Sequence, residues 1–253
     1  MRLTLIHLYG DLMSLYGDRG NIIALQRRCA WRQIELEVID ASVGDPVKPA
    51  ASDLFFFGGG QDREQATVSE DLARGNGEAI EEAVREGAAL LAVCGGYQLL
   101  GRFFRTGEGA EIPGSSLFDA FTVAGPERNV GNVVAETEID GTRRTLVGFE
   151  NHSGRTYLGP EAQPLARVLV GRGNNGEDKL EGCRQGTAIG TYLHGPILPK
   201  NPWLADWLIA AAVRRRTGAE MPLPQVDDTA ETIAHDTMAK RILEQGNART
   251  SIR

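Results

Sequence analysis

Two short runs of apolar residues, each followed directly by glycines, place the strongest limit on how this chain can fold. The first is "LFFF", 54–57, before "GGG", and the second is "AALLAV", 88–93, before Cys94 and two more glycines. Continuous apolar runs of this length are typical of strands that are buried on both faces, as in parallel sheets. The stretch between them, 69–87, has helical spacing. The sequence therefore predicts an α/β fold: a flavodoxin-like or Rossmann-like, mostly parallel sheet flanked by helices.

The second half of the chain predicts further strands and a helical tail. From about Glu111 onward, "FTVAGP" and "NVVAETEI" have the character of separate strands, and a following "DG" is a tight-turn signal, so we expect some antiparallel pairing. The segment 202–216 predicts a helix with Asn201 as its N-cap. We expect one domain over residues 1–216, followed by a linker and a C-terminal helical tail over 217–253. The tail helix either packs on the domain or docks on a partner.

Composition excludes several classes of protein. The chain has 253 residues and a formal net charge of −7, which argues against a general nucleic-acid binder. No apolar run approaches the roughly 20 residues of a transmembrane helix, and the N-terminal residues do not have the pattern of a secretory signal. Cys29, Cys94 and Cys183 form neither a disulfide framework nor a metal motif. We therefore expect a cytoplasmic protein without a metal site.

Cys94 lies where the chain must turn sharply. A nucleophile between a strand and a helix needs small neighbours on both sides, and "AVCGG", 92–96, fits the pattern small-x-nucleophile-x-small. We expect "GYQLLGRFF" to continue as a helix, whose N-terminus would favour a thiolate, and the N–H of Gly95 to face a developing oxyanion. The alternative is a buried structural cysteine. The glycines after Phe57 would lie at the same edge of the sheet.

A catalytic thiolate needs an acid or base, and four histidines are candidates. His7 lies within the first predicted strand, which favours a core position. His235 belongs to the tail helix, where we expect it on the surface. His152 and His194 each follow an apolar stretch, so both can reach the active edge of the sheet.

Four motifs occur in order along the chain: "FFFGGGQD", "LLAVCGGYQLLG", "GFENHSGRT" and "GTYLHGPILPKNP". In this combination the chain resembles the class I, or triad-type, glutamine amidotransferases, in their cobyric-acid-synthase-like branch. Within that branch it is most similar to the glutaminase subunits of lipid II isoglutaminyl synthases, which amidate D-glutamate of the peptidoglycan stem peptide to D-isoglutamine. The resemblance extends over about residues 1–216.

The resemblance assigns a role to each motif. It implies that Cys94 is the nucleophile and His194 the general acid and base. Backbone N–H groups near Gly59, Gly60 and Gly95 would form the oxyanion hole.

By the same resemblance, two side chains would bind L-glutamine. The guanidinium of Arg128 would pair with the free carboxylate, and Gln98 would hydrogen-bond the same substrate. The alternatives are a solvated loop arginine and a glutamine on a helix surface. His152 would line the pocket.

Two features are missing from this sequence. Many triad amidotransferases have a glutamate two residues after the histidine, but here that position is Pro196, so the group that orients His194 stays open. There is also no Gly-Lys pair and thus no phosphate-binding loop.

The absent phosphate-binding loop implies that a second chain carries out the synthetase reaction. The resemblance predicts a heterodimer with a Mur-ligase-like subunit that holds ATP and Mg²⁺ and reaches lipid II, while this chain has no cofactor of its own. The alternatives are an amidotransferase for a cobalamin-type or other acceptor, a non-catalytic regulatory module, and a thiol hydrolase of related fold.

Overall fold

The central sheet of the molecule is mostly parallel, as the sequence predicted. The computed structural model describes residues 1–14 and 18–250, with side chains as far as residue 246. Six strands follow the order β11-β12-β4-β3-β1-β2, and those from β12 to β2 run parallel. They are β1 (Arg2–Leu8), β2 (Glu35–Ala41), β3 (Leu54–Phe57), β4 (Ala89–Val93), β11 (Cys183–Gln185) and β12 (Ala188–Thr191).

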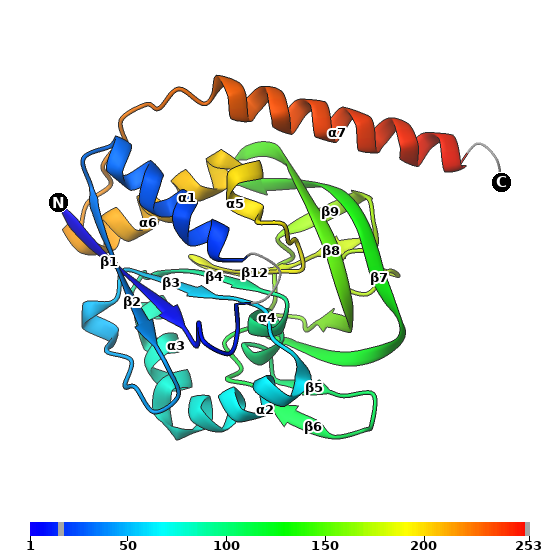
Figure 1. Cartoon of the computed structure of the whole chain (residues 1–253), viewed down its shortest axis with the longest axis horizontal. Coiled ribbons are helices and arrows are strands. Elements are labelled where there is room, and N and C mark those ends of the chain that lie inside the picture. Colours follow the sequence, from blue (N-terminus) through cyan, green and yellow to red (C-terminus); the bar gives the residue numbers. More distant parts are fainter. Residues whose placement is uncertain (15–17, 251–253) are drawn as a thin grey trace.

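Helices cover both faces of this sheet (Figure 1). One face carries α1 (Arg19–Trp31), α5 (Ile197–Lys200) and α6 (Pro202–Thr217). The other face carries η1 (Pro49–Ala51), α2 (Asp62–Asp71), the kinked turn η2 (Leu72–Asn76), α3 (Gly77–Arg85) and α4 (Gly95–Leu99). Every residue of β3 and β4 is buried. Because both faces are covered, only the strand ends are accessible to a ligand.

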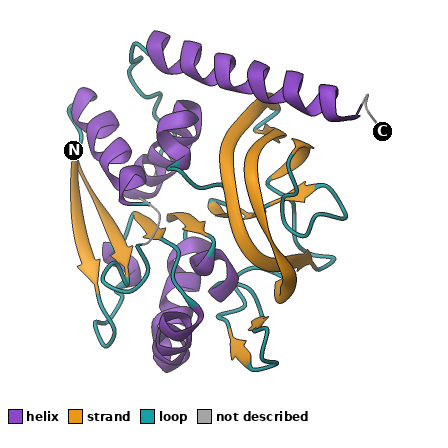
Figure 2. Ribbon diagram, turned by 45° about the vertical axis from the view of Figure 1, so that its right-hand side comes forward, coloured by secondary structure: helices purple, strands orange, loops and turns teal. Residues whose placement is uncertain are grey.

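A second, strongly curved sheet lies beside the first (Figure 2). Its order is β10-β9-β7-β5-β6, and β8 pairs with β7. The strands are β5 (Phe103–Arg105), β6 (Glu111–Pro113), β7 (Ala120–Ile139), β8 (Thr142–Leu158), β9 (Ala166–Val170) and β10 (Leu180–Glu181). A backbone pair between Phe149 and His194 joins β8 to the chain just beyond β12. This junction brings the second sheet next to the active edge of the first.

The prediction of two separate strands in "FTVAGP" and "NVVAETEI" was wrong, because both belong to β7. The register shifts between Ala124 and Asn129, which is a bulge in β7 while β8 continues alongside, so pairing resumes after the interruption. The predicted tight turn is confirmed: Asp140 and Gly141 have φ angles of 53° and 70° between β7 and β8.

Two local predictions also need correction. The helix after Cys94 ends at Leu99 instead of continuing through "GRFF", because Arg102 N–H pairs with Ala120 O at 2.7 Å and turns the chain into β5. Asn201 does not cap α6 with its side chain. Its amide instead exchanges hydrogen bonds with the backbone N–H and C=O of Val147, both at 2.9 Å, and so ties α6 to β8.

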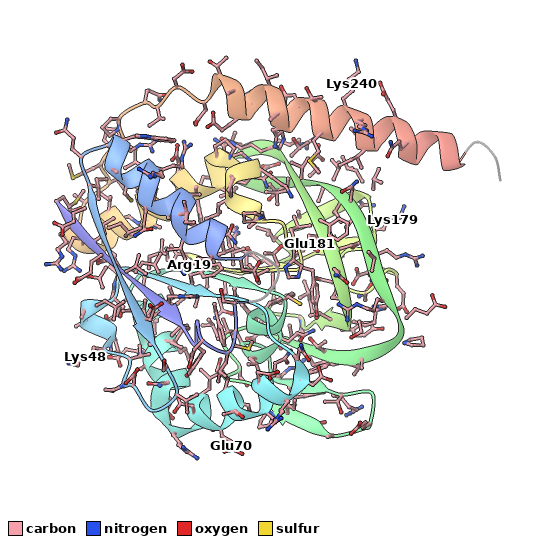
Figure 3. The ribbon with its side chains drawn as sticks, in the orientation of Figure 1. Arg19, Lys48, Glu70, Lys179, Glu181 and Lys240 are labelled. Carbon is pink, nitrogen blue, oxygen red and sulfur yellow. The ribbon has the colours of Figure 1, made fainter. Side chains whose placement is uncertain are left out.

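The tail helix α7 (Thr229–Thr250) packs across the second sheet (Figure 1). Val134 and Val147 from the hairpin contact Ala239 and Ile242 in a small apolar cluster. Figure 3 shows Lys240 on the outer side of this helix, directed away from the sheet.

Polar contacts hold the start of the tail. Arg28 lies 4% exposed and donates to the carboxylates of both Asp206 and Asp228 at 2.6–2.7 Å. His235 was predicted on the surface, but it is only partly exposed, because its two ring nitrogens lie 2.7 Å from Thr145 Oγ1 and 2.8 Å from Lys200 O.

Among the described residues, no helix is long and apolar enough to span a membrane.

Candidate active site

Cys94 occupies a sharp turn between β4 and α4, at the carboxyl end of the central sheet. Its φ of 52° and ψ of −106° are unusual for a residue with a side chain and cost on the order of 1–3 kcal/mol. Two hydrogen bonds hold the turn: Cys94 N–H donates to Thr191 O at 2.9 Å, and Gly96 N–H donates to Gly58 O at 3.0 Å. The side chain lines a cleft at this end of the sheet. The strained backbone conformation of Cys94 is thus located where its thiol faces a cleft that can hold a ligand.

His194 reaches the same place from β12, the parallel neighbour of β4. Its imidazole is close enough to the side chain of Cys94 for the two groups to interact electrostatically, and its Nδ1 lies 3.4 Å from Oδ1 of Asp18. Asp18 is 0% exposed. Thiol, imidazole and carboxylate therefore lie in one row, which is the arrangement that activates a nucleophile and orients its base.

The surroundings of His194 favour its charged form. Burial by itself lowers the pKa of an imidazole, but the hydrogen bonds and negative charges of Asp18 and Cys94 raise the pKa of His194 to about 10. A protonated imidazole beside the sulfur stabilises the thiolate, which is the reactive form of cysteine.

Asp18 is a candidate site residue that the sequence reasoning missed. It is separated from His194 by 176 positions and directly precedes α1. An acidic residue at a helix start normally indicates a cap, so no local signal distinguishes it. It occupies the role left open by Pro196, since it supplies the carboxylate that no residue after His194 provides.

The glycine turns after β3 and β4 bring backbone N–H groups to the thiol. The N–H of Gly59 donates to Asp18 Oδ2 at 3.1 Å and is therefore engaged in holding that carboxylate. Within the described chain, neither Gly60 nor Gly95 makes a hydrogen bond through its N–H. A Cβ placed on Gly95 would lie 3.0 Å from Gly60 N, so the two groups are close together and no side chain fits between them.

The cleft above Cys94 has a volume of about 460 Å³ and is predominantly polar. Its lining comprises Gly60, Gln61, Asp62, Arg63, Gln65, Cys94, Gln98, Phe104, Arg128, His152 and Ser153. Arg128 is held at the rim because its Nε donates to Asn151 Oδ1 at 3.0 Å and one terminal nitrogen donates to Asn151 O at 2.8 Å. Its second terminal nitrogen has no recorded partner in the described part of the chain.

Gln98 lies inside the cleft wall, 5% exposed, and not on a helix surface. Its Nε2 donates to Tyr192 Oη at 3.1 Å, and its Oε1 accepts from Gln65 Nε2 at 3.1 Å. Gln65 was not identified from the sequence. Its own Oε1 is buried and has no partner among the described residues, so it is a ready acceptor for a ligand.

Comparisons with known proteins agree with this geometry. Residues 4–202 match the model of the CobB/CobQ-like glutamine amidotransferase domain. The chain belongs to this amidotransferase family. It is 39% identical over 247 residues to the lipid II isoglutaminyl synthase (glutamine-hydrolyzing) subunit GatD of Staphylococcus aureus strain N315, covering 98% of this chain and 99% of that protein. It is 37% identical over 229 residues to the GatD subunit of Streptococcus pneumoniae R6, covering 90% and 86%.

A solved structure shows the same fold. A crystal structure of a glutamine amidotransferase aligns with a TM-score of 0.53 and 18% identity, over 82% of this chain and 98% of that one. The fold and the family inferred from the four motifs are therefore confirmed.

The remaining wall of this amidotransferase's cleft contains a second buried imidazole. His152 lies within β8, 2% exposed, and stacks on Tyr192 with 3.7 Å between ring centroids. Its Nδ1 lies 2.8 Å from Gly154 O, so that nitrogen carries the proton. Burial lowers the pKa of His152 to about 3, despite this hydrogen bond. His152 is therefore a neutral acceptor, in contrast to His194. Among the described residues, no three or more His, Cys, Asp or Glu side chains are arranged so that they could hold a metal ion.

Proposed function

We propose that this chain is the glutaminase subunit of a two-chain lipid II isoglutaminyl synthase. It hydrolyses L-glutamine and supplies ammonia to a Mur-ligase-like partner. The observation that carries the proposal is the row Cys94–His194–Asp18 at a strained strand–helix turn, in a chain that matches two GatD subunits over nearly its whole length.

The reaction begins when the Cys94 thiolate attacks the side-chain amide carbon of glutamine. A carbon–sulfur bond forms and the carbonyl oxygen becomes an oxyanion, which the N–H groups of Gly60 and Gly95 stabilise by about 3 kcal/mol per donor. The intermediate collapses, the carbon–nitrogen bond breaks, and protonated His194 gives its proton to the leaving nitrogen, which departs as ammonia. A glutamyl thioester remains on Cys94.

Water then completes the cycle. Neutral His194 takes a proton from the water as its oxygen attacks the thioester carbon, and the sulfur leaves as the thiolate beside the newly protonated imidazole. Asp18 keeps the imidazole in one orientation through both steps, and Gly59 in turn fixes Asp18.

Substrate recognition falls to the opposite wall. Arg128 pairs with the α-carboxylate of glutamine through its unused terminal nitrogen, while Gln98 and Gln65 present amide groups inside the cleft. ATP and Mg²⁺ belong to the partner, which activates the stem-peptide carboxylate. We place the reaction in the cytoplasm, where the three free cysteines stay reduced.

The test is co-expression with candidate Mur-ligase-like chains, followed by measurement of glutamate release and of glutamine- and ATP-dependent amidation of lipid II. Cys94→Ala should reduce both to background while the complex remains intact. Cys29→Ala is the matched control, because it removes a buried thiol of α1 outside the cleft. Glutamate release that persists in Cys94→Ala would refute the mechanism. A stable complex that releases glutamate but never amidates lipid II would refute the assignment of lipid II as the acceptor of the ammonia.

A further inference from the structure

A second cavity lies directly behind the wall that contains His152. It has a volume of about 470 Å³ and opens between β7, β9 and the C-terminal part of α7. Gly131, Glu150, Gly171 and Arg172 are among its lining residues. Glu150 and His152 share the buried face of β8, and Glu150 Oε2 lies 4.0 Å from His152 Nε2. His152 lines the Cys94 cleft and Glu150 lines the second cavity. The contact between these two side chains therefore separates the two cavities.

The groups at this contact are matched to a small molecule that donates hydrogen bonds. His152 Nε2 is buried without a partner among the described residues, and its lone pair is free because Nδ1 carries the proton. The Glu150 carboxylate accepts from the N–H groups of Arg172 and Gly173 and still has lone pairs to spare. Asn129 pairs directly across from His152, and its Nδ2 is a buried donor that also has no partner in the described chain.

We propose that ammonia released at Cys94 passes His152 and Glu150 and leaves through this second cavity. Ammonia has three N–H donors for the imidazole and the carboxylate, and one lone pair that can accept from Asn129. Burial lowers the pKa of His152 to about 3, so its imidazole is neutral, and a neutral imidazole is too weak an acid to convert ammonia to non-nucleophilic ammonium. This inference rests on the proposed glutaminase activity and specifies where its product goes.

Gly131 provides a way to block the passage without touching the cleft. It pairs with Glu150 across β7 and β8, so a side chain there would share the face of that carboxylate. A Cβ on Gly131 would meet no heavy atom within 4 Å. Gly131→Val should therefore fold normally and fill the open space beside Glu150.

The decisive measurement uses the two-chain complex. In Gly131→Val we expect glutamate release within about two-fold of the wild type, and at least about a five-fold loss of amidated product per glutamate released. Amidation supplied with external ammonium chloride should be unchanged. Gly107→Val is the matched control, since a Cβ there would also fit, with its nearest neighbour the Cβ of Ala124 at 4.0 Å, but in the β5–β6 turn. If Gly131→Val leaves the amount of amidated product per glutamate released unchanged, the proposed route of ammonia is wrong.

A second readout is independent of the acceptor and of the partner. In the isolated chain, the ¹⁵N resonance of His152 Nε2 should shift saturably when ammonium chloride is added in alkaline buffer. Glu150→Gln should weaken this response, because it replaces one acceptor by a donor. A resonance that ammonia does not move would contradict the proposal. If the complex fails to amidate lipid II even with external ammonia, the acceptor is wrong, and this titration still decides whether ammonia reaches His152.

Discussion

The two walls of the cleft each contain a buried histidine, and the two imidazoles have opposite properties. His194 and His152 are each only 2% exposed, so burial penalises the charged form of both. His194 faces a carboxylate and a thiol, and its pKa is raised to about 10 despite burial. For His152, burial is the largest effect and lowers the pKa to about 3; its Nδ1 faces only a backbone carbonyl. The comparison teaches that two equally buried imidazoles differ in charge because one hydrogen-bonds the carboxylate of Asp18 and the other hydrogen-bonds the backbone carbonyl of Gly154.

Removal of the Asp18 carboxylate should have the largest effect, because it takes away the group that distinguishes His194 from His152. Asp18→Asn keeps the shape of the side chain but removes the negative charge that orients His194 and favours its protonated form. We expect kcat for glutamate release to fall by about 10²–10⁴-fold, the range typical of a lost acid–base function. KM should change little. A loss of less than about two-fold would mean that another group orients the imidazole.

The same variant should change the pH dependence. The pKa of His194 is raised in the folded chain, so the stabilisation from its charged form is complete below the unfolded value of about 6.5 and is lost as the pH rises through about 10. Activity of the wild type should decline on the alkaline side near that value. In Asp18→Asn the decline should begin at lower pH. An unshifted alkaline limit in the pH profile of kcat/KM would contradict the assignment.

The second wall should affect substrate binding more than turnover. Arg128→Ala removes the guanidinium at the rim but no group near the sulfur, so we expect KM for glutamine to rise by about 10–100-fold. Arg128→Lys should recover only part of the affinity, because an ammonium cannot replace both hydrogen bonds to Asn151 that hold the guanidinium in place. Steady-state kinetics of both variants, compared with Asp18→Asn, separate the two walls. An equal fall in kcat would place Arg128 in the chemical step.

The difference between the walls also explains what the sequence could predict. The turn at Cys94 is encoded locally, because a buried strand, small neighbours and glycines all occur within a few positions. Asp18 depends on packing between segments 176 positions apart, and no pattern around it indicates a catalytic role. The state of His152 is likewise set by the ring of Tyr192 and the carbonyl of Gly154. The long hairpin was missed because a bulge and a turn have similar residue preferences.

Glu181 connects the two walls from behind. Figure 3 shows it in the interior, and its contacts place it between the sheets: it belongs to β10 and bonds to the chain at the end of β12. Its Oε1 accepts from Thr191 Oγ1 at 2.6 Å and from Tyr192 N–H at 2.9 Å. Thr191 O holds the N–H of Cys94, and the ring of Tyr192 stacks on His152. Glu181 thus positions a residue beside each wall without contacting the cleft.

Replacement of Glu181 by glutamine should have the smallest effect on activity, because the amide oxygen can still accept both hydrogen bonds. Burial raises the pKa of Glu181 from 4.5 to about 7, so the wild type loses stability as the pH rises from 4.5 through 7. Glu181→Gln has no such cost and should gain about 3 kcal/mol relative to the wild type between pH 4.5 and 8. Urea unfolding at the two pH values measures this, with the exposed Glu177→Gln as the matched control. A stability difference that does not grow with pH would mean that the pKa of Glu181 is not raised, and a charged carboxylate would then lie behind the two walls at neutral pH.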